Sequence, residues 1–129
     1  MDYYDWDGNE WDSIRWRGAV LSALRGSRGQ AFLKEALEAL DALPEKKLIA
    51  NELEAEGQVC LLGAVGKKRG IDMNGIDPED YYRIASVFGL ARAMAQEIMA
   101  VNDDTYDSDQ SPEMRYTRVR NWIVAQIAQ

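Results

Sequence analysis

The sequence contains no histidine, a single cysteine and only three prolines in 129 residues. Without histidine the chain lacks the usual general base at neutral pH, the commonest metal ligand and every Ser-His or Cys-His nucleophile pair. Cys60 cannot form a disulfide within the chain, which suits a reducing compartment. No run of about 18 apolar residues occurs, and no basic leader precedes an apolar stretch, so we expect a cytoplasmic protein without a membrane span.

The composition is that of one globular domain. The chain is 47% hydrophobic and 29% charged, which separates it from disordered sequences. A chain of this size buries roughly two thirds of its unfolded surface, enough for a single core. We therefore expect one domain rather than two.

Acidic residues are concentrated in two short segments. Residues 1–12 hold five acidic residues and no basic one, and residues 103–113 hold another five, again with no basic one. The whole chain has 22 acidic and 15 basic residues, so the remaining body has 12 acidic against 15 basic residues and a net charge of +3. An acidic protein repels nucleic acid, yet a basic face of the body can still attract an anion.

Residues 1–11 combine aspartate with tyrosine and tryptophan and show no helix or strand period. We predict an acidic, aromatic N-terminal arm ahead of a single helical domain over residues 12–129. Exposed tryptophan usually packs against another surface. Two interpretations stay open: Trp6 and Trp11 hold the arm against the body, or they bind a partner.

The first half of the chain predicts two helices. Position 12 or 13 can cap a helix that runs to Leu24, with Ile14 and Leu21 also facing inward. A second helix is predicted over residues 30–43, because its apolar residues recur at the i, i+3, i+4 and i+7 positions. Pro44 ends this helix.

Residues 45–61 allow two interpretations. They fit a helix that resumes after Pro44, and they fit a small β-hairpin near residues 47–61 with strands at 48–53 and 58–61. Gly57 favours the hairpin, because a tight turn needs a residue that adopts positive φ.

The second half predicts further helices over residues 60–69, 77–87, 90–101 and 111–127. Gly70 and Gly89 mark two of the breaks, Pro78 opens one helix after Asp77, and Ser111 caps the last. The predicted fold class is therefore mainly α (α+β): a single compact domain of about five helices with one small β-hairpin.

A basic turn is the first candidate for binding chemistry. Residues 25–30 place two arginines beside two glycines and a hydroxyl at a predicted helix start, where free backbone N–H groups favour an anion. The same residues also suit a plain interhelical turn, and they lack the Gly-Lys-Ser/Thr ending of a P-loop. The candidate anion-binding residues, with a second basic run included, are Arg25, Ser27, Arg28, Gly29, Gln30, Lys67, Lys68 and Arg69.

The acidic and aromatic segments are the second candidate. The acidic loop, residues 102–110, does not fit a calcium-binding loop. Counted from Asn102 it lacks the glycine at position six, and counted from Asp103 it lacks the acidic residue at position twelve. Cys60 lies beside an apolar run and is predicted to be a buried small hydrophobe. We predict no catalytic residue, metal or cofactor. The candidate partner-binding residues are Trp6, Trp11, Asp103, Asp104, Asp107 and Asp109.

The chain also carries a series of short motifs: Arg28-Gly-Gln-Ala-Phe-Leu33, Leu40-Asp-Ala-Leu-Pro-Glu45, Val59-Cys-Leu-Leu-Gly-Ala-Val65, Arg69-Gly-Ile-Asp72, Asn102-Asp103, Ser111-Pro-Glu113 and Arg118-Val-Arg-Asn-Trp122. In this order they resemble small uncharacterised proteins encoded by bacteriophages and prophages. The resemblance covers most of the chain from about residue 12 onward. It implies a context, a small accessory protein made during infection or lysogeny, and carries over no catalytic residue.

Together these observations predict a small non-catalytic phage protein that binds and modulates or inhibits a host or anti-phage-defence protein. Its carboxylates suit a basic surface that normally holds nucleic acid. The alternative is a protein that sequesters a nucleotide second messenger through residues 25–30. The net charge of −7 argues against direct nucleic-acid binding, and an enzyme that works through carboxylates alone stays open. The amphipathic helices leave room for a homodimer.

Overall fold

The computed structural model describes residues 9–103 and 110–128, with side chains from residue 13 onward. Most of these residues are helical, and one two-stranded antiparallel sheet accompanies the helices, which confirms the mainly α prediction. The helices are α1 (Asn9–Arg25), α2 (Ser27–Asp41), α3 (Leu61–Arg69), α4 (Tyr81–Phe88), α5 (Arg92–Asp103) and α6 (Pro112–Gln126), and the strands are β1 (Glu54–Ala55) and β2 (Gln58–Val59).

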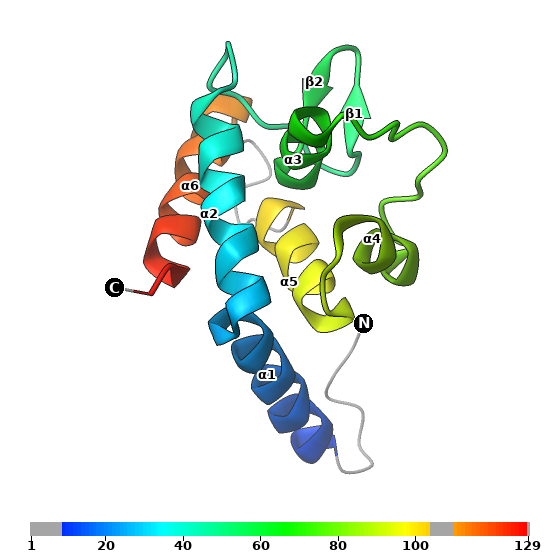
Figure 1. The fold of residues 1–129 in the computed structure, drawn as a ribbon, viewed down its shortest axis with the longest axis vertical. Coiled ribbons are helices and arrows are strands. Elements are labelled where there is room, and N and C mark those ends of the chain that lie inside the picture. The colour runs from blue at the N-terminus through cyan, green and yellow to red at the C-terminus, as the bar shows by residue number, and fades with distance from the viewer. Residues whose placement is uncertain (1–8, 104–109, 129) are drawn as a thin grey trace.

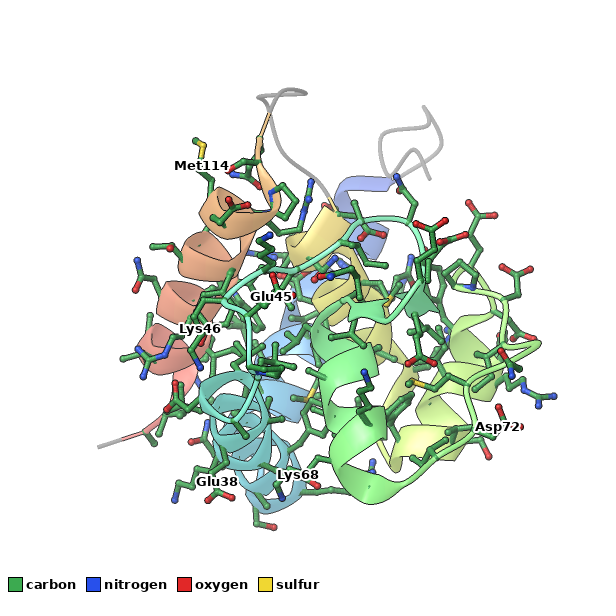
Figure 2. All side chains as sticks on the ribbon, turned by 90° about the horizontal axis from the view of Figure 1, so that it is seen from above. Glu38, Glu45, Lys46, Lys68, Asp72 and Met114 are labelled. Atoms are coloured by element: carbon green, nitrogen blue, oxygen red, sulfur yellow. The ribbon has the colours of Figure 1, made fainter. Side chains whose placement is uncertain are left out.

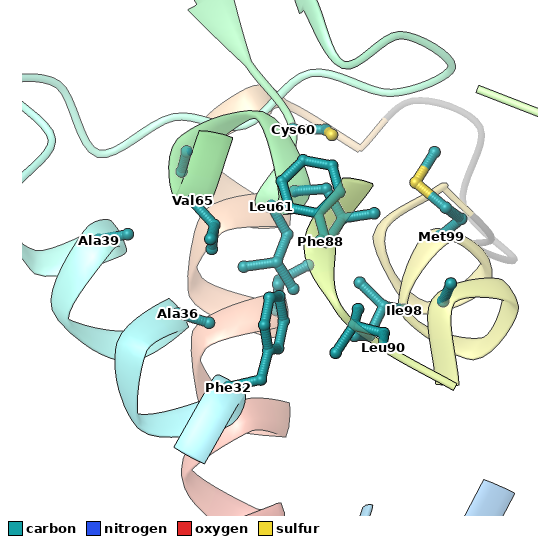
Figure 3. Close-up of a cluster of buried hydrophobic side chains, with 14 of the residues drawn as sticks. Phe32, Ala36, Ala39, Cys60, Leu61, Val65, Phe88, Leu90, Ile98 and Met99 are labelled. Carbon is teal, nitrogen blue, oxygen red and sulfur yellow. The ribbon is translucent and has the colours of Figure 1, made fainter. Parts of the chain in front are cut away.

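Two helices organise the packing. α2 packs against α1, α3 and α6, and α5 packs against α1, α3, α4 and α6. Figure 1 shows α2 alongside α6, with α4 and α5 on the other side of the molecule and α3 with the hairpin at the end away from α1. The core lies where these helices meet. In Figure 3, Phe32 and Ala36 of α2 face Leu61 and Val65 of α3, with Phe88 of α4 between them and α5.

The predicted start of the first helix is wrong, and so is the inward position predicted for Ile14 and Leu21, whereas Leu24 is buried as predicted. α1 begins at Asn9, so residues 9–11 belong to the helix and not to an arm, while residues 1–8 lie outside the described residues. Ile14 and Leu21 are 56% and 39% exposed, whereas Val20 and Leu24 are buried. α1 has two apolar faces, one with Val20 and Leu24 and one with Ile14 and Leu21. The face that packs against α2 and α5 is buried, and the other stays exposed.

The second helix begins earlier than predicted, at Ser27. Only Gly26 separates it from α1, in an extended conformation with φ −67° and ψ 162°. The helix ends at Asp41, ahead of Pro44, as predicted within two residues. The basic turn is therefore the junction of two helices rather than a loop of six residues.

The hairpin prediction is confirmed, but the hairpin is tighter than expected. Its strands pair Glu54 with Val59 and Ala55 with Gln58. Glu56 and Gly57 form the turn with φ of 53° and 79°, the two positive values that a two-residue hairpin turn favours. Residues 48–53 are not a regular strand, although two backbone hydrogen bonds join them to the returning segment: the Ile49 N–H donates to the Val59 carbonyl at 2.9 Å, and the Cys60 N–H donates to the Leu53 carbonyl at 3.1 Å.

The helix ends follow their capping chemistry. Ser111 accepts a hydrogen bond from the Met114 N–H at 3.1 Å and caps α6 as predicted. Gly70 and Gly89 end α3 and α4 in the left-handed conformation. The predicted start of α4 at Asp77 is wrong by four residues. The Asp77 carboxylate accepts from the Glu79 N–H at 2.8 Å and closes a turn, so the helix starts only after Asp80.

No single helix among the described residues is long and apolar enough to cross a membrane. α4 and α5 reach the required length and composition only as a pair, and they are bent by 105° relative to each other.

Candidate functional site

The junction of α1 and α2 holds the predicted anion site, and its glycines serve the packing of the two helices. Gly29 is buried, and a Cβ atom at this position would lie 1.9 Å from the Ala23 carbonyl oxygen. Only glycine therefore lets the first turn of α2 approach the last turn of α1 this closely. Gly29 is a structural residue at this junction.

Gln30 also has a structural role. Its Nε2 donates to the carbonyl oxygens of Leu24 at 2.7 Å and Gln126 at 3.0 Å, and its Oε1 accepts from the Ala128 N–H at 2.7 Å. One amide thus ties the end of α1 to the end of α6. All three bonds would be lost if the side chain turned toward a ligand.

Arg25, Ser27 and Arg28 remain exposed at the same junction. The two guanidinium groups make no hydrogen bond or ion pair with any residue that the structure describes. A pocket of about 270 Å³ lies beside Ser27 and Arg28. It is lined by Ser22, Ala23, Gly26, Ser27, Arg28, Gly29, Leu90, Ala91 and Met94.

The second basic run, Lys67 to Arg69, does not line this pocket. Arg69 donates two hydrogen bonds to the Glu35 carboxylate of α2, one of them from Nε to Oε2 at 2.9 Å. It donates a third to the Phe88 carbonyl at 3.1 Å. Its guanidinium also lies 5.8 Å from the centre of the Phe32 ring. The hydrogen bond from Arg69 holds the pKa of Glu35 below its usual value.

Lys67 and Lys68 make longer ion pairs. The Lys68 ammonium lies 3.9 Å from the Glu38 carboxylate, and Figure 2 shows both residues at the same end of α2 and α3. The Lys67 ammonium lies 3.8 Å from the Glu54 carboxylate of the hairpin. The run therefore fastens α3 to α2 and to the hairpin.

Most of the predicted partner-binding residues fall outside the described structure. Trp6, Asp104, Asp107 and Asp109 lie outside the described residues, and Trp11 belongs to α1 with a side chain that is not described. These predictions stay untested.

Asp103, the one predicted partner-binding residue whose side chain is described, lies in the last turn of α5. Its Oδ1 accepts from the Asn51 N–H at 3.1 Å and from the Asn102 Nδ2 at 2.7 Å. Asn51 has a φ of 68°, so the carboxylate holds a residue in the left-handed region. Asp103 therefore has a structural task.

Asn102 is the centre of a buried polar cluster that the sequence pattern did not predict. Its side chain is fully buried, and it accepts from the Leu61 N–H at 3.0 Å and donates to the Ile49 carbonyl at 2.9 Å. Arg115, also buried, donates from Nε to the Asn102 carbonyl at 3.0 Å. The only sequence signal was an amide that continues the apolar face of α5, four residues after Ile98.

Arg118 of α6 joins the two ends of the acidic loop. It donates to the carbonyl oxygens of Val101 and Asn102, the latter at 3.2 Å, on the side where α5 ends. It also donates twice to Gln110 Oε1, at 3.1 and 3.2 Å, on the side where the chain returns. Residues 102 and 110 are therefore bound to the same guanidinium.

Cys60 is confirmed as a buried residue. Its Sγ accepts a weak hydrogen bond from the Gly63 N–H at 3.4 Å and so caps α3. Burial raises the pKa of the thiol to about 12, which removes the thiolate that nucleophilic chemistry needs. Among the described residues, no three Asp, Glu or Cys side chains are grouped so as to hold a metal ion.

Comparison of the chain with protein-family models, with curated proteins and with solved structures finds no match. The resemblance to phage and prophage proteins therefore stays a hypothesis.

Proposed function

We propose that this chain is a non-catalytic accessory protein of phage or prophage origin that binds a host or anti-phage-defence protein through its acidic segments. The observation that carries the proposal is the anchoring of the acidic loop by Arg118, which donates hydrogen bonds to the Asn102 carbonyl ahead of the loop and to Gln110 Oε1 after it. Binding residues are commonly found on loops whose ends are fixed by a rigid scaffold. Residues 104–109 carry three aspartates and no basic residue between these anchors.

The chemistry of the body supports binding rather than catalysis. The thiol of Cys60 is buried with a pKa raised to about 12, and Arg69 is held by Glu35. Asn102 and Arg115 are used to join α5, α6 and the start of α3. These groups stabilise the scaffold, while the carboxylates of the loop can replace phosphates on a partner's arginine and lysine side chains.

The test is capture of a partner with a tagged chain from infected or lysogenic cells, followed by competition. A partner that normally binds nucleic acid should be released by duplex DNA and by increased salt. The triple variant Asp104→Asn, Asp107→Asn and Asp109→Asn should lose this partner. Binding that survives in the triple variant would count against the proposed role of the loop.

A matched control removes the same charge elsewhere. Glu52, Glu56 and Glu79 are exposed away from the acidic loop, and their replacement by glutamine also removes three negative charges. This control variant should keep the partner. Equal loss in both triple variants would mean that total charge, and not the loop, is responsible.

Sequestration of a nucleotide second messenger is the second candidate function, supported by the pocket of about 270 Å³ beside Arg28. This volume is slightly below the roughly 300–1,000 Å³ of ordinary ligand sites, so it suits a phosphate-bearing part of a ligand better than a whole nucleotide. Calorimetry with a panel of nucleotides tests it. Binding should be lost in Arg25→Ala and Arg28→Ala and unchanged in Arg83→Ala, an exposed arginine of α4.

A further inference from the structure

An apolar stripe of α1 is left exposed by the part of the chain that the structure describes. Ile14 is 56% exposed and Leu21 is 39% exposed, on a helix whose other side packs through Val20 and Leu24. Gly18 lies between them on the same face, and the space beside it is open. In Figure 1 the start of α1 extends past the helices that pack beside its end.

The spacing of this stripe is that of a helix pair. Positions 14, 18, 21 and 25 are separated by four, three and four residues, the heptad spacing that keeps one seam facing a second helix. α1 has 17 residues and so is about 25 Å long. The absence of a side chain at Gly18 lets a second helix approach closely at the middle of the seam.

The charges along α1 indicate which helix fits. The first turn of α1 carries Glu10 and Asp12 and no basic residue, whereas its last turn ends in Arg25. Arg25 is exposed, and its guanidinium has no ion pair with any described residue. In an antiparallel pair of two α1 helices, the acidic start of each helix lies beside the basic end of the other.

We propose that the Ile14–Leu21 face of α1 binds the same face of a second copy of this chain as an antiparallel helix pair. The arrangement is a two-fold interface, in which one patch pairs with itself. Its small size, one short helix from each copy, places it among weak and concentration-dependent dimers. This inference does not depend on the acidic loop or on its partner.

Analytical ultracentrifugation of the full chain over a wide concentration range tests the proposal. The wild type should pass from monomer to dimer as concentration rises. Leu21→Glu buries a charge from each copy and should raise the dissociation constant at least about 100-fold. Val124→Glu, at an apolar side chain of α6 that is 47% exposed, is the matched control and should leave it unchanged.

The orientation has its own test. Arg25→Glu should weaken the dimer about tenfold, because it sets an acidic residue against the acidic start of the other helix, and Arg25→Lys should keep it. Circular dichroism verifies that each variant folds. A wild type that stays monomeric, equal effects of Leu21→Glu and Val124→Glu, or a tighter dimer in Arg25→Glu would each overturn the proposal.

Discussion

Replacement of Asn102 by alanine tests how strongly this buried amide stabilises the contact between α5, the start of α3 and residue 49. The side chain is fully buried and holds the Leu61 N–H, the Ile49 carbonyl and the Asp103 carboxylate. Asn102→Ala removes the partner of the buried Leu61 N–H and of the half-buried Ile49 carbonyl. Each unsatisfied buried group costs about 1–3 kcal/mol, and a small cavity adds to this cost. We expect a loss of about 3 kcal/mol in the free energy of unfolding.

Urea unfolding followed by circular dichroism measures this loss. For a chain of this length, about 3 kcal/mol corresponds to a fall of roughly 10 °C in Tm. The control is Asn121→Ala, because Asn121 is exposed on α6. That variant should change stability by less than about 0.5 kcal/mol.

The isosteric variant Asn102→Asp separates lost hydrogen bonds from lost volume. An aspartate still accepts from the Leu61 N–H, but its second oxygen faces the Ile49 carbonyl and the Asp103 carboxylate. Its pKa should rise on folding, so the destabilisation should appear as the pH rises above about 4 and fade below it. The reasoning is refuted if Asn102→Ala costs no more than Asn121→Ala, or if the cost of Asn102→Asp does not depend on pH.

Three further predictions concern packing, the thiol and acid stability. Gly29→Ala should destabilise the fold by about 3 kcal/mol, because its Cβ would meet the Ala23 carbonyl, whereas Gly18→Ala on the open face of α1 should be neutral or stabilising by up to about 1 kcal/mol in the same urea titration. Cys60 should react with a thiol reagent at pH 8 only after unfolding, as absorbance of the released chromophore will show, because burial raises its pKa to about 12. Arg69 lowers the pKa of Glu35, so the pair stabilises the fold above the unfolded pKa and loses this effect as pH falls through the folded value. The stability difference between wild type and Glu35→Gln should therefore shrink on acidification, and a constant difference would contradict this account.

Local chemistry made the helix ends predictable. Ser111 with Pro112, and the basic residues followed by Gly70, are capping signals that act within one turn. Gly57 indicated the hairpin for the same reason. Asp77 was wrongly predicted to start α4, because an aspartate that caps a helix and an aspartate that closes a short turn make the same hydrogen bond to a backbone N–H.

The buried face of α1 was not predictable from its own pattern. Leu24 was predicted to face inward, but Ile14 and Leu21 are as apolar as the residues that the helix buries, and only the position of α2 and α5 selects Val20 in their place. The roles of Gln30 and Asn102 were hidden for a similar reason. Their partners lie 96 and 41 residues away in the chain, at Gln126 and Leu61.

Four properties followed from the amino-acid sequence without a structure: the helical class, the C-terminal ends of the helices, the lack of histidine chemistry and the concentration of acidic charge in two segments. These properties depend on residue type and on neighbours within a few positions. The tertiary structure alone decided that Arg69 faces Glu35, that Arg118 anchors both ends of the acidic loop and that Ile14 stays exposed. Such contacts join segments far apart in the chain, and they form only when the whole core is packed in its native arrangement.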